Sequence, residues 1–465
     1  MMDLRRGASR LPALAIVLLL ALAGAGRLGA GEVFPYRIEL VEVDFPVMPG
    51  LQSFAFGQHE GVWLLVGGRL DGIHARQPMR AFPPSENNTN LHVVDVSSRE
   101  VWSVSVLDLP TGLAEQLQST NLNFYQDGGM LYLIGGYGYS TVARDHVTYP
   151  YFTAVDVPGT IAAVREGRDV SPYFRQISSP AFAVTGGQLG KIGDELYLVG
   201  GHRFDGRYHP MGMGPFRQAY TNEVRVFAVS DPVISGTHAT DSGEGLTVEL
   251  VRVFSDPDHL RRRDYNLVPQ LFPDGSEGYM ISAGVFQAHV DLPFLYPVDI
   301  RTSGITPRES FDQYLSHYHS GKLPLYDEAS GEMHSIFFGG IAQYYFRDGV
   351  LIRDDLVPFV DTISRVTRAP DDSFTEYVLP VTMPGLLGAS GEFIPNPEFL
   401  RAGSRVIRTA DIGGGPAVAG HLVGGIRSPE LNPFFTNRTG LTTADSTIYA
   451  VVLTREPVVH TKVVR

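Results

Sequence analysis

A short apolar run that ends in two glycines recurs along this chain and constrains its fold more than any other feature. Runs of roughly four to six β-prone apolar residues suit strands that are buried on both faces. The glycines allow a turn with positive φ and a close approach of neighbouring backbones. The copies lie at 63–68, 131–136, 196–201, 335–340 and 420–425, with a degenerate sixth copy at 279–284. Repetition of one strand type predicts an all-β repeat protein.

The pattern resembles the kelch motif, in which the glycine pair ends the second strand of a propeller blade. The first copy also carries candidates for the third strand, 90–95, and for the fourth, 101–104, which contains Trp102. The resemblance implies one blade for each copy, and therefore a six-bladed kelch-type β-propeller. The expected blades are 50–110, 118–170, 178–255, 262–312, 313–383 and 397–455.

An alternating segment near the N-terminus has no place in the first blade. Apolar and polar residues alternate over 36–46, but 53–58 lies at the better distance to be the inner strand before the first glycine pair. The last blade lacks an outer strand. We therefore expect 36–46 to pair into the last blade and to close the ring, which leaves no long open sheet edge.

The first 30 residues have the pattern of a secretory signal peptide. Arg5 and Arg6 precede an apolar segment at 11–23, which is short for a membrane span. The chain contains no cysteine, so a lipid anchor on cysteine and disulfides are excluded. We expect removal of 1–30, no stable membrane anchor afterwards, export to the periplasm or the exterior, and one propeller domain over 31–465.

Charge and composition exclude several classes of function. The net charge of −13 argues against nucleic acid as a partner. Galactose-oxidase-like copper enzymes share the propeller, but their cofactor needs a tyrosine cross-linked to cysteine, which this chain lacks. There is no nucleotide-binding loop or zinc-protease motif. We expect no cofactor.

The resemblance also indicates where a ligand would bind. In a kelch blade the loop after the glycine pair opens on the same rim as the loop that leads into the inner strand. Here these loops are rich in arginine, aspartate, histidine and tyrosine, a mixture that suits a sugar or a peptide. The expected ligand-binding residues are Arg69, Asp71, His74, Tyr137, Arg203, Asp205, Arg207, Arg263, Asp264, Tyr265, His317, His319, Tyr344 and Arg427.

Each of these motifs also has a structural interpretation. The Arg-x-Asp-Gly sequences at 69–72 and 203–206 are compatible with a β-turn and a local ion pair. The arginines at 261–263 could hold a carboxylate or could pair with acidic residues of neighbouring blades. His317 and His319 have a spacing that places both imidazoles on one face of a strand, but such histidines are more often structural, and we expect no tight metal site.

Three functions remain open at this stage. The first is a binding module for a glycan or protein ligand on one rim. The second is a periplasmic carbohydrate-active enzyme of the sialic acid mutarotase type, because exported kelch-fold enzymes include sialic acid mutarotases and that chemistry needs only a positioned acid and base. The third is a structural assembly protein. No residue is assigned a catalytic role, since fold alone does not specify activity.

Overall fold

The computed structural model describes residues 31–45, 48–77, 79–209, 216–230, 245–400 and 404–463. The expected signal peptide and Pro46, at the end of the expected N-terminal strand, lie outside these residues. The described chain is all-β and propeller-like, with short α-helices only at α1 (Thr111–Gln116) and α2 (Val157–Glu166). None of the described helices is long and apolar enough to cross a membrane.

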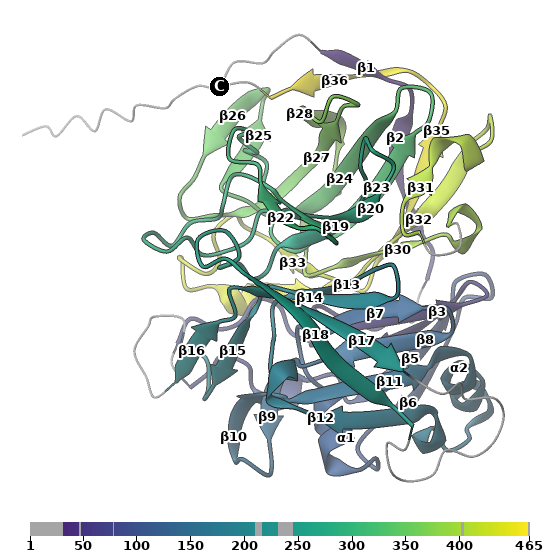
Figure 1. Cartoon of the computed structure of the whole chain (residues 1–465), viewed down its shortest axis with the longest axis vertical. Helices are drawn as coiled ribbons and strands as arrows, with labels where there is room; N and C mark the ends of the chain where they lie inside the picture. The colour runs from purple at the N-terminus through teal and green to yellow at the C-terminus, as the bar shows by residue number, and fades with distance from the viewer. Residues whose placement is uncertain are drawn as a thin grey trace, which may run out of the picture.

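Six sheets, numbered here one to six in chain order, contain the repeated strands (Figure 1). Sheet one consists of β3 (Ala55–His59), β4 (Val62–Val66), β5 (Asn90–Asp95) and β6 (Glu100–Ser105). Sheet two consists of β7 (Asn123–Asp127), β8 (Met130–Ile134), β11 (Tyr151–Asp156) and β12 (Phe174–Ser178). Sheet three consists of β13 (Gln188–Ile192), β14 (Glu195–Val199), β17 (Glu223–Ser230) and β18 (Thr247–Ser255).

The other three sheets follow the same strand order. Sheet four consists of β19 (Asn266–Leu271), β20 (Glu277–Ser282), β21 (Val298–Arg301) and β22 (Gly304–Pro307). Sheet five contains β23 (Gly321–Asp327), β24 (Glu332–Ile341), β27 (Phe359–Arg368) and β28 (Phe374–Thr382), extended by β36 (Val458–Lys462), β1 (Glu32–Phe34) and β31 (Ile407–Arg408). Sheet six consists of β30 (Glu392–Pro395), β32 (Ala417–Val423), β35 (Ile448–Thr454) and β2 (Arg37–Val43).

Smaller sheets lie in the loops that follow the glycine pairs and, for β29 (Leu386–Ala389), in the loop that leads into the inner strand of sheet six. One contains β9 (Tyr137–Ser140), β10 (Asp145–Thr148), β15 (His202–Asp205) and β16 (Arg217–Tyr220). The others are the hairpin of β25 (Tyr344–Arg347) with β26 (Val350–Arg353), and the group of β29 (Leu386–Ala389), β33 (Ile426–Ser428) and β34 (Thr443–Ala444).

Two of the expected blade boundaries are wrong. The outer strand of sheet two begins at Phe174, beyond the expected limit of 170, because α2 is inserted between β11 and β12. Asp156 caps this helix by accepting a hydrogen bond from the Gly159 N–H at 3.1 Å. The inner strand of sheet six begins at Glu392, before the expected start at 397.

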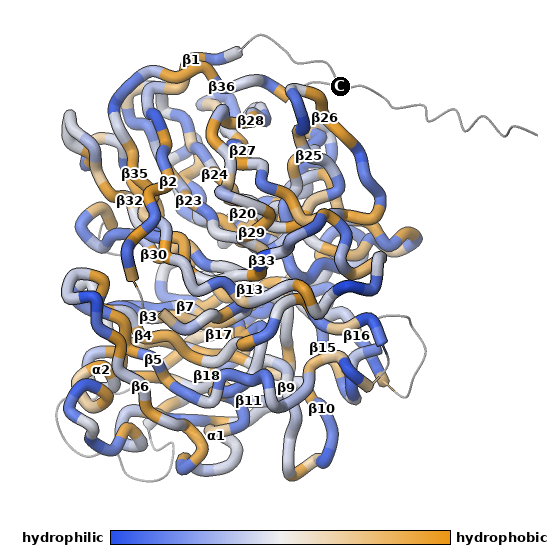
Figure 2. The backbone as a smooth tube through the Cα atoms, turned by 180° about the vertical axis from the view of Figure 1, so that it is seen from behind, coloured by the Kyte–Doolittle hydropathy of each residue, from blue (hydrophilic) through white to orange (hydrophobic). Residues whose placement is uncertain are grey.

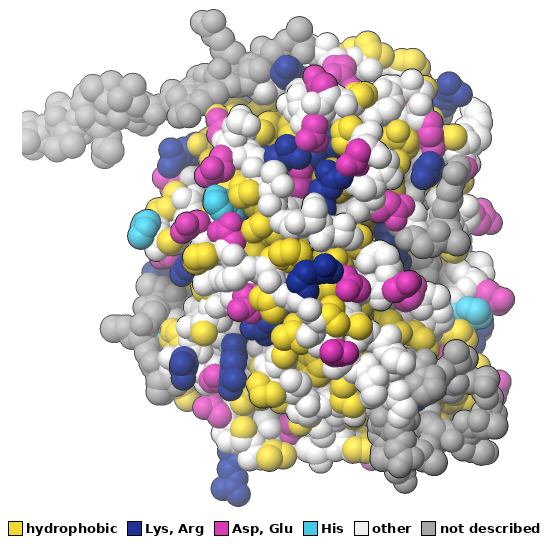
Figure 3. All heavy atoms as spheres, viewed as in Figure 1, with side chains coloured by type: hydrophobic (Ala, Val, Ile, Leu, Met, Phe, Trp, Pro, Cys, Tyr) yellow, Lys and Arg dark blue, Asp and Glu magenta, His cyan; other side chains and the backbone are white. Residues whose placement is uncertain are grey.

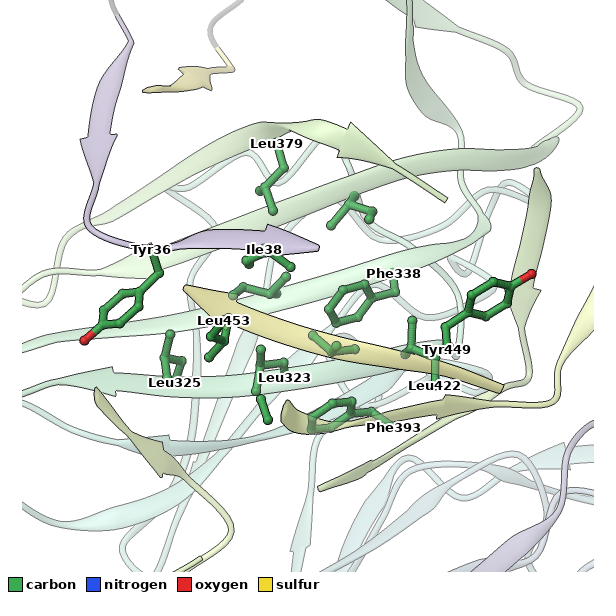
Figure 4. Packing of buried hydrophobic residues seen from close by; sticks show 14 of the residues in the cluster. Tyr36, Ile38, Leu323, Leu325, Phe338, Leu379, Phe393, Leu422, Tyr449 and Leu453 are labelled. Atoms are coloured by element: carbon green, nitrogen blue, oxygen red, sulfur yellow. The ribbon is translucent and has the colours of Figure 1, made fainter. Parts of the chain in front are cut away.

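The N-terminal strand pairs where the alternating pattern predicted. β2 runs antiparallel to β35, from Arg37 opposite Thr454 to Val43 opposite Ile448. In Figure 1 the purple N-terminal strands accordingly lie among the green and yellow C-terminal ones. Tyr36 and Ile38 contribute to the same buried cluster as Leu453 (Figure 4), so the pairing also buries apolar side chains.

The glycine pairs connect neighbouring sheets through their backbones. The second glycine donates its N–H to the carbonyl just before the inner strand of the next sheet. The donors Gly68, Gly136, Gly201 and Gly425 reach Ser119, Val184, Arg262 and Leu51 at 2.9, 3.1, 2.8 and 2.8 Å. The last of these bonds joins sheet six to sheet one. A Cβ on Gly135 would lie only 1.8 Å from the Val184 carbonyl oxygen, so this approach requires glycine.

A second set of hydrogen bonds joins the starts of the inner strands. The residues involved, here called the throat residues, are Ser53, Asn121, Gly186, Asp264, His319 and Ser390. The backbone N–H of Asn121 donates to the Ser53 carbonyl, and the N–H of Ser53 donates to the Ser390 carbonyl. In the same way Ser390 donates to His319, His319 to Asp264 and Asp264 to Gly186, and all five distances lie within 2.7–3.1 Å. The Thr185 hydroxyl donates to the Asn121 carbonyl at 3.2 Å. Each bond joins neighbouring sheets, so the throat residues lie around a common centre.

Hydrophobic residues fill most of the space between sheets, together with a few buried charged side chains such as Asp299 and Arg368. Figure 2 shows hydrophobic segments along the strands of both halves of the molecule, with hydrophilic residues at many turns. On the face in Figure 3, basic and acidic side chains are interspersed. That face therefore presents no extended basic surface.

Candidate functional site

Two cavities meet at the throat residues. The larger has a volume of about 450 Å³ and the smaller about 140 Å³. Ser53, Asn121, Asp264 and His319 line both cavities, which therefore lie on either side of the throat. Loops that lead into the inner strands and loops that follow the glycine pairs contribute to the larger cavity, whereas the inner strands themselves line the smaller one.

Aromatic rings form much of the wall of the larger cavity. They come from several loops, and the aromatic lining residues are Phe82, Tyr137, Phe204, Tyr208, Phe286, Tyr318, Phe359, Phe434 and Phe435. His74 joins this wall, with its ring 5.0 Å from that of Tyr208 and 5.3 Å from that of Phe82 between centroids. The volume and the aromatic lining are those of a small-molecule site, in which a few polar groups fix the orientation of the ligand.

Arg263 is the principal cationic group of this wall. Its side chain is 12% exposed, and its guanidinium carbon lies 5.3 Å from the Phe286 ring centroid and 6.0 Å from that of Tyr208. The nearest carboxylate is that of Asp264, with 3.8 Å between Nε and Oδ2, which is too far for a hydrogen bond. Nε is buried without a hydrogen-bond partner among the described residues. A largely buried guanidinium that makes no hydrogen bond to a carboxylate of the described residues favours an anionic group supplied by a ligand.

Two neutral histidines flank the arginine. Burial lowers the pKa of His74 to about 4 and the nearby Arg263 contributes, so the ring is uncharged near neutral pH. Burial, and then Arg263, lower the pKa of His202 well below its usual value. The Gln218 amide donates to His202 Nδ1 at 2.7 Å, which leaves the ring proton on Nε2. The cavity thus presents neutral imidazole groups beside the Arg263 guanidinium.

A histidine–glutamate pair occupies the throat. His319 Nε2 lies 2.7 Å from Glu392 Oε1, and the carboxylate of Glu392 is buried. Burial alone would raise the pKa of Glu392, but His319 and Lys322 outweigh it and hold this pKa below the usual value. The ionised carboxylate therefore accepts a hydrogen bond from the His319 Nε2–H, and this bond orients the imidazole.

Five of the sequence-predicted site residues line the larger cavity: His74, Tyr137, Arg263, Asp264 and His319. Their loops come from four different sheets, so distant parts of the sequence converge here. Tyr137 is oriented by its hydroxyl, which donates to the Gly206 carbonyl at 2.8 Å and accepts from the Tyr208 N–H at 2.9 Å.

The Arg-x-Asp-Gly motifs form local ion pairs in both places. Arg69 is 2% exposed and binds Asp71 through two 2.7 Å hydrogen bonds, with a third bond to Asn87 Oδ1 at 2.9 Å. Arg203 is exposed and pairs with Asp205 at 3.0 Å. None of these four charged residues lines either cavity. Their positions match the structural interpretation of the motif.

Other predicted residues also lie outside the cavities, for reasons of packing. Tyr265 is fully buried, and its hydroxyl donates to the Val199 carbonyl at 2.5 Å. His317 is fully buried beside Phe337, so it does not share an open surface with His319. The remaining three hold neighbouring groups: Arg207 donates to the Ala81 carbonyl, Tyr344 contacts Tyr314, and Arg427 pairs with Asp445.

The sequence analysis overlooked several lining residues. His202 and Tyr318 occupy the expected loop positions but were not selected, while Phe434 comes from a loop with no motif. Lys322 and Glu392 line the smaller cavity from inner strands, which were treated only as structural. No group of three or more His, Cys, Asp or Glu residues within the described ranges could hold a metal ion.

Comparisons with known proteins assign no family. No family model and no curated protein matches this chain. Among solved structures, that of YjhT aligns with a TM-score of 0.43 and 10% sequence identity, over 89% of this chain and 98% of YjhT.

Proposed function

We propose that the six sheets are the blades of one six-bladed kelch-type β-propeller over residues 31–465, closed by β2. The glycine-pair hydrogen bond from Gly425 to Leu51 and the antiparallel pairing of β2 with β35 support this proposal. Hydrogen bonds between throat residues support it independently. We further propose that 1–30 is removed as a signal peptide and that the propeller acts outside the cytoplasm.

We propose that the protein is a binding module for a small saccharide that carries a carboxylate, and that the larger cavity is its site. The observation that carries this proposal is Arg263, a largely buried guanidinium on the cavity wall whose nearest carboxylate, that of Asp264, lies 3.8 Å away. A carboxylate of the ligand would pair with this guanidinium through charge-assisted hydrogen bonds.

The remaining lining suits the rest of such a ligand. Apolar faces of a sugar ring stack on aromatic side chains, which are abundant in this wall. Asp264 and His319 at the floor supply a carboxylate and an imidazole for the hydroxyl groups. A peptide ligand is less favoured, because the site is a cavity of about 450 Å³ and not an exposed groove or sheet edge.

The test is calorimetric titration of the purified mature chain with acidic monosaccharides, their neutral counterparts and short acidic peptides. We expect the acidic sugars to bind, and Arg263→Gln to weaken binding about tenfold to a hundredfold, because a hydrogen bond to a charged group contributes about 1.5–3 kcal/mol. Arg203→Gln is the matched control, since Arg203 is exposed and lies outside both cavities. It should leave affinity unchanged.

Thermal unfolding of both variants separates binding from folding. If Arg263→Gln lowers the melting temperature and leaves the affinity intact, the guanidinium is structural and the proposal fails. Equal binding of neutral and acidic sugars would reject the role of the carboxylate. Binding of the peptides alone would assign the cavity to a protein ligand instead.

A further inference from the structure

Lysine is rare in this chain, and one lysine lies inside the propeller-like body. Of the 37 basic residues only three are lysines, namely Lys191, Lys322 and Lys462. Arginine stays protonated in proteins, whereas a buried lysine loses its proton readily and can then act as a nucleophile. A lysine within a cavity of an arginine-rich protein therefore offers chemistry that the other basic residues cannot provide.

Lys322 lies on β23 and interrupts an apolar ring in the smaller cavity. Its counterparts, each three residues beyond a throat residue on the other inner strands, are Phe56, Phe124, Leu189, Leu267 and Phe393. All six side chains line the smaller cavity. Five of the six positions are thus apolar, and the sixth places an amine among them.

The amine faces one buried carboxylate without a close bond to it. Lys322 Nζ lies 3.9 Å from Glu392 Oε2, while the other carboxylate oxygen binds His319. Within the described residues Nζ makes no hydrogen bond of normal length. Burial lowers the pKa of the Lys322 amine, and the Glu392 carboxylate only partly opposes this. The free-base form is therefore more accessible at Lys322 than at a solvated lysine.

We propose that Lys322 is a nucleophile that forms an imine with the carbonyl group of a small aldehyde or α-keto acid in the smaller cavity. The volume of about 140 Å³ has room for a molecule of a few heavy atoms, and the smaller cavity shares four lining residues with the larger one. This activity is distinct from the proposed saccharide binding, because its nucleophile lines the smaller cavity and not the larger one.

Imine formation needs only the amine, the carbonyl compound and solvent water. The Lys322 ammonium loses its proton to water, a loss that burial favours, and leaves a neutral amine. The nitrogen lone pair attacks the carbonyl carbon, so an N–C bond forms as the C=O π bond breaks. Proton transfer from nitrogen to oxygen gives the carbinolamine. Its hydroxyl takes up a proton from water and leaves as water, and the N–C bond becomes double, which gives a protonated imine.

Reductive trapping tests the proposal on the unmodified mature protein. The chain is incubated with glyoxylate and cyanoborohydride at pH 6 to 9, and the modified amines are then located by mass spectrometry. Lys191 and Lys462 are internal controls, and Lys191 is ion-paired with Asp127 at 2.5 Å. We expect Lys322 to be carboxymethylated at least tenfold faster than either control, with half-maximal rate at a pH below that of Lys462.

Two further measurements identify why Lys322 is labelled faster than the other two lysines. Urea-unfolded protein should label the three lysines at similar rates, which would show that the fold creates the reactivity. Glu392→Gln keeps the size of the side chain but removes the carboxylate that favours the protonated amine, so it should lower the pH of half-maximal labelling at Lys322 and leave Lys462 unchanged. A Lys322 rate equal to or below the control rates in folded protein would overturn the proposal, whatever the outcome of saccharide titration.

Discussion

Replacing Gly135 by alanine tests whether the glycine pairs hold neighbouring sheets together. Gly135 has a φ of +68°, and an added Cβ would lie 1.8 Å from the Val184 carbonyl oxygen in the next sheet. That oxygen accepts hydrogen bonds from the Gly136 N–H at 3.1 Å and from Asn123 Nδ2 at 2.9 Å. Because the obstacle is backbone, a rotamer change cannot remove it.

The expected cost follows from these contacts. Alanine in the left-handed region costs about 1–2 kcal/mol. Displacing the Val184 carbonyl weakens two buried hydrogen bonds, each with a net contribution of about 1 kcal/mol or more. We therefore expect Gly135→Ala to lower the free energy of unfolding by about 3–4 kcal/mol.

Gly128→Ala is the control, and unfolding in urea is the assay. Gly128 has a φ of +54° in the hairpin of the same sheet, but an added Cβ there would meet no atom within 4 Å. It should cost only the conformational 1–2 kcal/mol. The difference of about 2 kcal/mol measures the contact between sheets. Equal destabilisation by the two variants would refute the reasoning.

Two further predictions concern buried charges. Asp299 of sheet four contacts Arg368 of sheet five at 2.5 Å, and both side chains are buried. Asp299→Ala should therefore lower the free energy of unfolding, measured in urea, by about 3–5 kcal/mol, because it leaves a buried charge unpaired. Adding Arg368→Met should recover part of that loss. Burial lowers the pKa of His317 to about 4, while its Nδ1–H donates to the Gly339 carbonyl at 2.5 Å. The free energy of unfolding that neutral, buried His317 contributes is therefore complete above pH 6.5. It is lost as the pH falls toward 4, by up to about 1.4 kcal/mol per pH unit. His317→Gln should reduce this slope of stability against pH, and an unchanged slope would contradict the assignment.

The strands of this fold could be predicted from local patterns, because each copy carries its own signal. The apolar runs become β4, β8, β14, β24 and β32, and the alternation over 36–46 correctly predicted the partner of β2. Helix α2 was not anticipated, since proline and glycine occupy its first turn and its apolar stretch is short. Its cap and its packing on sheet one depend on the folded structure.

The site was harder to predict, because residue type does not reveal which partner a side chain finds. Arg69 and Arg263 occur in similar polar loops, yet Arg69 has Asp71 and Asn87 within reach, whereas the Arg263 Nε has no partner among the described residues. His317 and His319 are two residues apart, but only His319 reaches the throat. Lys322 carried a signal in composition, namely the scarcity of lysine, which becomes informative only once the cavity is known.

The pairing of β2 with β35 has a consequence for the order of events during folding. Strand β2, close to the start of the described chain, finds its partner near the other end, with Arg37 opposite Thr454. In an open solenoid, each repeat contacts only its neighbours and folding can propagate from any of them. Here the two ends must meet. Contacts between residues so far apart in sequence slow folding, because the chain loses the entropy of closing the loop before the contacts stabilise it. A growing chain therefore keeps β2 unpaired until its C-terminal strands have been made, and a chain truncated before β35 never completes its last sheet.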